Sequence, residues 1–165
     1  QAACEAEQAT DAMALRIWPQ EPLQPAEAQR RLREAIYNAV APSLEGPVRR
    51  ALDLGCSVGV GTRALKTWLE ERQGEAVEVE GLDLSPHMLA VARAREAERA
   101  AATETPEETP EETSRIRVWH HAAAEATGLP SGTYDLITLQ FVCHELPAQA
   151  TRAVLVEAEI GRAHV

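Results

Sequence analysis

The sequence predicts an α/β fold in which a parallel sheet has helices on both faces. Short apolar segments alternate along the chain with longer segments whose apolar residues recur at helical spacing, and this alternation is typical of parallel sheets. Residues 134–141, YDLITLQF, are apolar almost throughout, as expected for a strand that is buried on both faces. A chain of 165 residues is long enough for one such domain with a hydrophobic core.

The first half of the chain is predicted to contain a helix, a strand and a second helix. Residues 1–25 are interpreted as an irregular N-terminal segment, because they contain several prolines and no periodic pattern. Residues 26–41 repeat apolar side chains at helical spacing, which predicts one apolar stripe. The members of this stripe are Leu32, Ala35, Ile36, Ala39 and Val40. A strand is expected over residues 48–54 and a helix over residues 62–72, which Gly74 ends.

The second half repeats the alternation of strand and helix. Residues 77–84, VEVEGLDL, suit a strand, although Gly81 interrupts their pattern. Ser85 and Pro86 open a helix, because a hydroxyl N-cap followed by proline is a common helix start. The remaining elements expected are strands over residues 116–119 and 134–141 and a helix over residues 147–157.

One partial domain is expected over residues 26–159. Residues 103–114, TETPEETPEETS, repeat the motif TPEE and lack apolar side chains that could join a core. Their prolines prevent a continuous helix, so they are interpreted as an acidic low-complexity loop inserted in the domain. Residues 160–165, IGRAHV, resemble one reading frame of a sequencing-library adapter and are interpreted as a non-native tail. The alternative is an ordinary helix end with Gly161 as its cap.

Net charge and cysteine usage argue against several classes of protein. The formal net charge is −10, whereas a nucleic-acid partner needs a basic surface. No apolar run approaches the roughly 18 residues of a membrane span. Cys4, Cys56 and Cys143 lie far apart, so neither a disulfide framework nor a zinc site is expected. We therefore expect an intracellular, cytoplasmic protein, with a plastid or mitochondrial location left open because the chain begins without methionine.

Glycine and acidic residues follow the predicted strands, at the edge of a parallel sheet where ligands bind. The first strand runs into residues 53–59, DLGCSVG, in which Gly55 and Gly59 permit positive φ and close approach of a ligand to main-chain N–H groups. Asp83 lies about 24 residues after Gly59, a spacing at which an acidic residue accepts hydrogen bonds from a ribose. The pattern therefore indicates a nucleoside-binding site.

A dinucleotide-binding site is the alternative interpretation of the same glycines. Residues 59–64, GVGTRA, satisfy the pattern GxGxxA. In such sites the strand leads directly into the first glycine, whereas Asp53 and Gly55 begin the turn earlier here. A NAD-binding oxidoreductase is therefore the second candidate, and it leaves Asp53 unexplained.

Residues 53–59 and 81–89, DLGCSVG and GLDLSPHML, resemble two motifs of class I methyltransferases that depend on S-adenosylmethionine (SAM). Residues 123–146 are similar to the adenine-binding loop and fourth strand of that family. The likeness covers about residues 48–158 and points to the small-molecule branch (methyltransferase type 11, ubiquinone and menaquinone methyltransferases). It implies a Rossmann-like sheet truncated here after about the fourth strand and the following helix. The chain is thus expected to be a fragment that carries the SAM-binding half and is inactive by itself.

The resemblance also implies roles for individual residues. Asp53 would anchor the glycine loop near the ammonium group of the cofactor, and Asp83 would accept both ribose hydroxyls. Ser57 stands where the family usually has glycine. The cofactor-binding residues implied in this way are Asp53, Gly55, Cys56, Ser57, Gly59, Asp83, Leu84, Met88, Ala124, Glu125 and Gln140.

The expected reaction transfers a methyl group from SAM to a small-molecule acceptor, and a SAM-binding relative without catalysis is a further alternative. His144 is the candidate general base, with a packing or helix-capping role as the other interpretation. His120 and His121 are expected at the surface of a strand end, and no metal site is expected. Cys56 and Cys143 are expected to be packing residues and not nucleophiles. No oligomeric state follows from the sequence.

Overall fold

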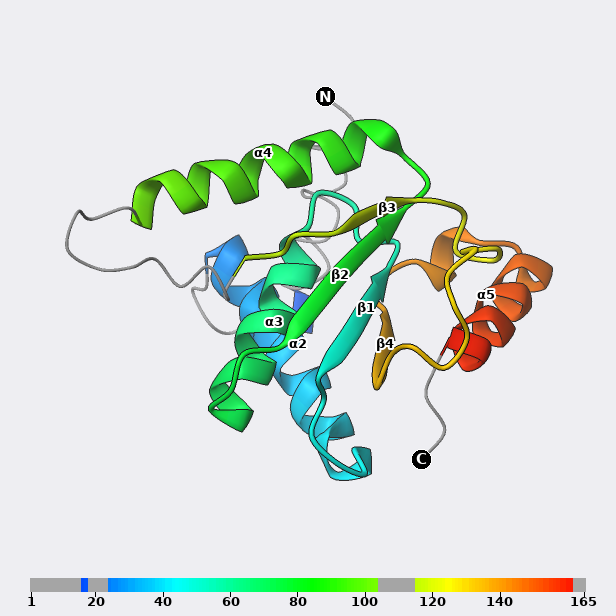
Figure 1. Ribbon diagram of the computed structural model, residues 1–165, viewed down its shortest axis with the longest axis horizontal. Coiled ribbons are helices and arrows are strands. Elements are labelled where there is room, and N and C mark those ends of the chain that lie inside the picture. Colours follow the sequence, from blue (N-terminus) through cyan, green and yellow to red (C-terminus); the bar gives the residue numbers. More distant parts are fainter. Residues whose placement is uncertain (1–15, 18–23, 104–114, 162–165) are drawn as a thin grey trace. The chain divides into compact units, whose positions relative to one another are not determined.

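The structure is a computed structural model that describes residues 16–17, 24–103 and 115–161 (Figure 1). The chain divides into two compact units, residues 1–47 and 48–165, and each is described by itself. The acidic repeat predicted to be a loop lies almost entirely outside the described residues. Most of the predicted N-terminal irregular segment and residues 162–165 also lie outside them.

The N-terminal unit contains helix α2 (Pro25–Val40), followed by the 3-10 turn η1 (Ala41–Ser43). The helix is confirmed, but its buried face differs from the apolar stripe of the sequence. Its buried residues are Ala28, Gln29, Arg33 and Tyr37, whereas Ile36 and Val40 of the predicted stripe are exposed. Arg33 Nη1 donates to Gln29 Oε1 at 2.5 Å, so these two buried polar side chains are joined within the helix.

The second unit is built on a four-stranded parallel sheet in the order β3-β2-β1-β4. Its strands are β1 (Arg50–Leu54), β2 (Glu78–Asp83), β3 (Trp119–His121) and β4 (Leu136–Leu139). Alternate residues of each strand face opposite sides of the sheet. The fold class predicted from the sequence, a Rossmann-like parallel sheet, is confirmed.

Helices cover both faces of this sheet (Figure 1). On one face, β1 and β2 meet α3 (Val60–Gln73), and Trp119 packs with Leu89 and Ala92 of α4 (Pro86–Thr103). On the other face, Val154 of α5 (Ala148–Gly161) packs in a core with four buried residues. These are Leu52, Leu54, Leu82 and Tyr134.

Two strands differ from their predicted extents. The third strand begins at Trp119 and not at Ile116, because the N–H of Ile116 donates to the Glu96 carboxylate of α4 at 3.4 Å. The fourth has four paired residues, not eight, and each of them is only half-buried. The expectation that β4 is buried on both faces was therefore wrong, because this strand lies at the edge of the described sheet and pairs only with β1.

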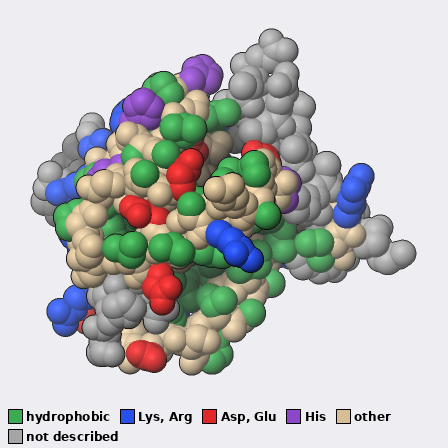
Figure 2. Space-filling view, turned by 90° about the vertical axis from the view of Figure 1, so that its right-hand side faces the viewer, with side chains coloured by type: hydrophobic (Ala, Val, Ile, Leu, Met, Phe, Trp, Pro, Cys, Tyr) green, Lys and Arg blue, Asp and Glu red, His purple; other side chains and the backbone are tan. Residues whose placement is uncertain are grey.

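Helix α5 presents apolar side chains at the surface. Leu155, Val156 and Ile160 are each at least half exposed, and Figure 2, which views the side of the molecule where α5 lies in Figure 1, shows hydrophobic side chains scattered at the surface between acidic ones. The carbonyl groups of Ile160 and Gly161 accept main-chain hydrogen bonds from residues 132–134. In the described part of the chain, no helix is long and apolar enough to cross a membrane.

Candidate functional site

The tips of three neighbouring strands meet at the carboxyl edge of the sheet. Leu54 of β1 pairs with Leu82 of β2 on one side and with Leu139 of β4 on the other. The residues that follow these partners are Gly55, Asp83 and Gln140. The three strand ends meet at one edge, as the sequence indicated, and the strand order places the glycine loop between Asp83 and Gln140.

The loop between β1 and α3 has left-handed backbone at three positions. φ is +69° at Gly55, +50° at Ser57 and +80° at Gly59. A Cβ atom at Gly55 would lie 2.3 Å from Val142 Cγ2, and one at Gly59 would lie 2.6 Å from Trp119 Cη2. These two glycines thus make room for the protein's own side chains. Ser57 adopts the left-handed conformation without being glycine, at a cost of roughly 1–2 kcal/mol.

Asp83 binds the main chain on both sides of the site. Its Oδ2 accepts the N–H of Ser57 at 2.8 Å, and its Oδ1 accepts the N–H of Ser85 at 2.8 Å. The first bond holds the glycine loop, and the second holds the start of α4. Each carboxylate oxygen has a further lone pair, so the half-buried Asp83 can still accept hydrogen bonds from a ligand.

Asp53 is buried beneath the loop, with a residue exposure of 3%. Its Oδ2 accepts the Thr62 hydroxyl of α3 at 2.7 Å, and its Oδ1 accepts the Thr138 hydroxyl of β4 at 2.8 Å. This carboxylate therefore joins β1 to a helix and to the neighbouring strand, which accounts for an acidic residue inside an apolar strand. Its predicted contact with a ligand ammonium group stays a prediction.

The other predicted cofactor residues surround the same edge. Leu84 is 67% exposed directly after Asp83, and Met88 is half-buried in the first turn of α4, where its N–H lies 3.4 Å from Ser85 Oγ. Ala124 packs against the core on the α5 face, and the next residue, Glu125, is exposed.

The Cys56 side chain is buried, and burial raises the pKa of its thiol, with the nearby Asp53 and Asp83 carboxylates adding to the rise.

The histidines and Cys143 differ in part from expectation. His121 is exposed as predicted, but His120 is only 25% exposed and its Nε2 lies 2.6 Å from the buried Glu80 carboxylate, so its assignment to the surface was wrong. Cys143 is exposed and does not pack in the core. The His144 side chain is exposed, and its Nε2 lies 3.6 Å from Glu145 Oε1 within the 3-10 turn η3 (Cys143–Glu145). Among the described residues, no group of three or more His, Cys, Asp or Glu side chains could hold a metal ion.

Comparison with known proteins decides the family. A family described as "Methyltransferase domain" matches residues 51–160, which include β2, β3 and β4 and nearly all of β1 and α5. The chain belongs to this methyltransferase family. This is the class I family that the two acidic motifs indicated, and the match does not favour a NAD-binding oxidoreductase. The small-molecule branch suggested by the sequence stays a prediction.

Solved structures share the fold of this methyltransferase domain. SAM-bound CalS10, an amino pentose methyltransferase from Micromonospora echinaspora, is 22% identical over 81% of this chain and 46% of its own, with a TM-score of 0.56. The glycopeptide N-methyltransferase MtfA is 19% identical over 80% and 52%, also with a TM-score of 0.56. The [4+2]-cyclase SpnF is 20% identical over 86% and 44%, with a TM-score of 0.59. The chain thus spans about half the length of these structures, and a search of curated proteins found no match.

Two site residues of the methyltransferase domain escaped sequence reasoning. Thr62 and Thr138 hold the Asp53 carboxylate but lie 9 and 85 residues from it in the chain. For Thr138, the available signal was a threonine within an apolar strand, because a hydroxyl group removed from water needs a partner. That signal does not identify the partner.

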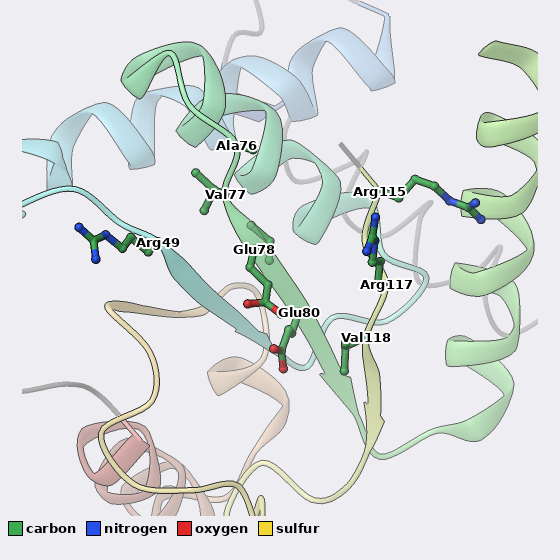
Figure 3. Close-up of a pocket in the computed structure, with 9 residues that line it drawn as sticks. Arg49, Ala76, Val77, Glu78, Glu80, Arg115, Arg117 and Val118 are labelled. Atoms are coloured by element: carbon green, nitrogen blue, oxygen red, sulfur yellow. The ribbon is translucent and has the colours of Figure 1, made fainter. Parts of the chain in front are cut away.

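A pocket of about 330 Å³ lies toward the opposite end of the strands, at the start of β2 and the approach to β3 (Figure 3). Its lining includes Glu78, Glu80, Arg49, Arg115 and Arg117. In Figure 3, Arg49 and Arg115 extend to opposite sides and do not converge on a common point. This pocket is separate from the residues predicted to bind the cofactor, which follow the carboxyl ends of the strands.

Proposed function

We propose that this methyltransferase domain binds SAM at the carboxyl edge of its sheet and serves methyl transfer to a small-molecule acceptor. The observation that carries the proposal is the position of Asp83, which holds the glycine loop of β1 by one oxygen and the start of α4 by the other. A carboxylate in this position, at the tip of the neighbouring strand, suits a ribose with two hydroxyl donors. The family match supports the same conclusion.

The side chains at this edge fit the parts of the cofactor. Leu84 exposes 67% of its surface beside Asp83, and a large apolar side chain at the surface there suits the face of an adenine ring. Met88 and Ala124 would add apolar contacts to the ring, while Glu125 would accept from its amino group. The cofactor-binding set we propose is the one implied by the sequence, with Gly55, Ser57 and Gly59 along the methionine moiety and Gln140 at the sulfonium end.

When bound, SAM supplies a methyl group on a positively charged sulfur, and the chain supplies orientation. Asp53 stabilises the site by holding β1, α3 and β4 together through its two threonine partners. His144 is exposed after β4 and stays the candidate base for acceptors that must lose a proton.

The test compares two carboxylates, at opposite ends of the sheet, that each accept two hydrogen bonds from main-chain N–H groups. Asp83→Ala removes the proposed ribose acceptor, and we expect the affinity for S-adenosylhomocysteine to fall at least about tenfold, because each lost charge-assisted hydrogen bond is worth about 1.5–3 kcal/mol before compensation. Asp135→Ala is the matched control, since Asp135 Oδ2 also accepts two main-chain N–H groups, from Arg49 at 2.8 Å and Arg50 at 2.9 Å.

Titration calorimetry with S-adenosylhomocysteine and with NAD, at a temperature where thermal melts show each variant folded, gives the result. Equal affinity in the Asp83→Ala variant and the parent chain would contradict the proposed role of Asp83. Binding of NAD in place of S-adenosylhomocysteine would contradict the proposed function. Binding of S-adenosylhomocysteine by a protein that transfers no methyl group from SAM would indicate a SAM-binding protein without that activity.

A further inference from the structure

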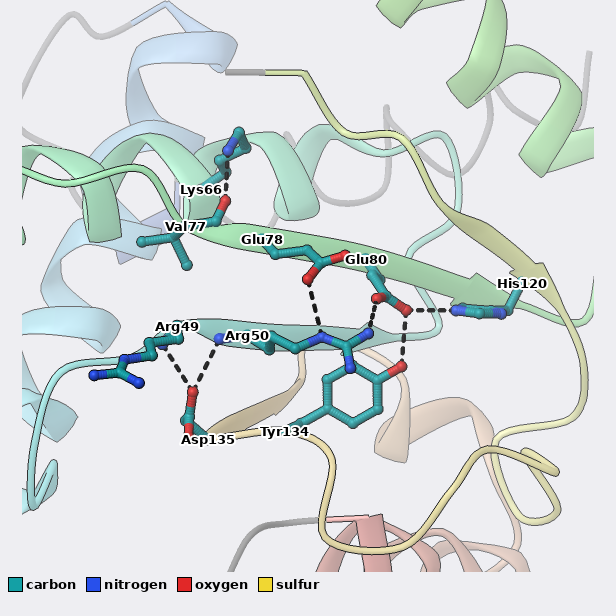
Figure 4. A network of polar contacts seen from close by, with 9 residues as sticks. All are labelled: Arg49, Arg50, Lys66, Val77, Glu78, Glu80, His120, Tyr134 and Asp135. Carbon is teal, nitrogen blue, oxygen red and sulfur yellow. Dashed lines mark hydrogen bonds and ion pairs between the residues drawn. The ribbon is translucent and has the colours of Figure 1, made fainter. Parts of the chain in front are cut away.

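A buried carboxylate on the α5 face of the sheet collects hydrogen bonds from three directions (Figure 4). Glu80 of β2 is only 3% exposed. Its Oε1 accepts from Arg50 Nη2 at 2.6 Å, and its Oε2 is 2.6 Å from His120 Nε2 and accepts the Tyr134 hydroxyl at 2.8 Å. The glycine loop and Asp83 make no use of this cluster, and its chemistry is not explained by the proposed reaction.

Each partner of Glu80 comes from a different part of the sheet. Arg50 belongs to β1, His120 to β3, and Tyr134 to the residues that lead into β4. Burial by itself would raise the pKa of Glu80, but the hydrogen bonds from His120, Tyr134 and Arg50 outweigh it and lower the pKa. Glu80 is therefore an ionised carboxylate at the point where side chains from across the sheet converge.

The bond to His120 holds β3, the shortest strand of the described sheet. β3 has three residues paired with β2 and lies at the edge of the sheet formed by the described residues. A short edge strand has few main-chain bonds to fix its position, so one side-chain bond to a buried charge contributes a large share. His120 lies opposite Leu82 of β2, one residue before the end of β3.

The chain that leaves β3 leads directly into the proposed adenosine site. His121, the next residue, lies opposite Asp83, and its Nε2 is 3.0 Å from the carbonyl oxygen of Leu84. The N–H of Ala122 then donates to the carbonyl of Asp83 at 3.3 Å. Ala124 and Glu125 lie in the turn that follows β3, so the placement of β3 sets their distance from Asp83.

We infer that Glu80 and His120 are positioning residues of the cofactor site, which hold the tip of β3 against the tip of β2 and thereby set the width between the ribose side and the adenine side. This inference rests on the proposed SAM site. Neither residue is assigned a contact with the cofactor. Tyr134 donates to the same Glu80 oxygen but holds the approach to β4, so it stabilises the sheet without setting this width.

The test measures the affinity of the full chain for S-adenosylhomocysteine by calorimetry in four variants. His120→Phe removes the donor and keeps a ring, and we expect the affinity to fall about three- to tenfold. His120→Asn, which is too short to reach Glu80, should weaken binding similarly. His120→Gln, whose amide can still donate to Glu80, should restore affinity to within about twofold. Tyr134→Phe is the matched control and should bind within about twofold of the parent.

Thermal melts accompany each titration so that affinity is compared only between folded proteins. The inference is overturned if His120→Phe and His120→Asn bind like the parent. It is also overturned if Tyr134→Phe loses as much affinity as they do, because the effect is then general stability, or if His120→Gln does not recover binding. If His120→Phe fails to fold, the comparison of His120→Asn with His120→Gln decides. A parent chain that binds no S-adenosylhomocysteine would overturn the proposed function, and this inference with it.

Discussion

The acidic residues at the carboxyl edge of the sheet form hydrogen bonds with other groups of the protein. Both oxygens of Asp83 hold main-chain N–H groups, and both oxygens of Asp53 hold threonine hydroxyls. The site is thus preorganised, since its acidic groups are oriented before any ligand arrives. The left-handed Ser57 adds backbone strain at the same loop, where the N–H it offers to Asp83 fixes its position.

Gly81 in β2 is predicted to tolerate no side chain. A Cβ atom there would lie 2.6 Å from Trp119 Cε3 and 2.9 Å from Cys56 Sγ. We expect Gly81→Ala to reduce the free energy of unfolding by about 1–3 kcal/mol, because the surrounding core must shift. Urea denaturation measures the loss, and Gly46→Ala, where nothing lies within 4 Å of the added atom, is the control. Equal stability of the Gly81→Ala variant and the parent would show that the Trp119 side chain can move aside without loss of stability.

The cysteines of the described residues are predicted to differ in reactivity. Cys143 is exposed, whereas Cys56 is buried and its thiol has a raised pKa, from burial first and then from the charges of Asp53 and Asp83. Since the thiolate is the reactive form, iodoacetamide should modify Cys143 in the native protein and Cys56 only after denaturation. Mass spectrometry of the alkylated peptides checks this expectation. Modification of both at similar rates would indicate that the glycine loop opens readily in solution.

Helices and strands of this domain are joined by two polar clamps as well as by main-chain hydrogen bonds. Each clamp is a buried carboxylate that accepts hydrogen bonds from several elements. Asp53 links β1 to α3 and β4, while Glu80 links β2 to β1, β3 and the approach to β4. The two clamps lie on opposite faces of the sheet, because Asp53 and Leu52 alternate along β1 and Leu52 is the partner of Glu80. Strand β4 depends on both, since its only paired neighbour in the described sheet is β1.

Thr138→Val tests the clamp between β1 and β4. The variant keeps the shape of the side chain but deprives the buried Asp53 carboxylate of one donor, so we expect a loss of about 1–3 kcal/mol in the free energy of unfolding. Thr133→Val is the control, because its hydroxyl donates to the Pro130 carbonyl at an exposed position and should matter less. Chemical denaturation compares the two. Similar losses in both variants would contradict a special role for the Asp53 clamp.

The stability of the whole molecule is predicted to fall in acid through Glu80. The pKa of Glu80 is lowered in the folded protein from its ordinary value of 4.5, mainly because bonds from His120, Tyr134 and Arg50 outweigh the effect of burial. A carboxylate with a lowered folded pKa contributes stability above its unfolded pKa. That contribution is lost as the pH falls below 4.5 and through the folded pKa.

Urea denaturation between pH 7 and pH 3 measures this contribution. Glu80→Gln should be less stable than the parent at neutral pH, and the difference should shrink as the pH falls, because the variant has no carboxylate to protonate at this position. Glu78→Gln is the control, since Glu78 pairs with the same Arg50 at 3.0 Å but is 55% exposed. A constant difference between parent and Glu80→Gln across this range would show that the ionised form of Glu80 adds no stability.

The order of the elements, the parallel sheet and the residues at its carboxyl edge were predictable from local pattern, because periodicity, glycine and helix-start residues act over a few neighbours. The family resemblance rested on the same short motifs and was confirmed. Tertiary structure alone decided which groups pair over long distances. The partners of Glu80 lie 30, 40 and 54 residues away in the chain, and Thr138 lies 85 residues from Asp53. The buried face of α2 and the half-buried state of β4 likewise depend on what surrounds each element, which no local pattern contains.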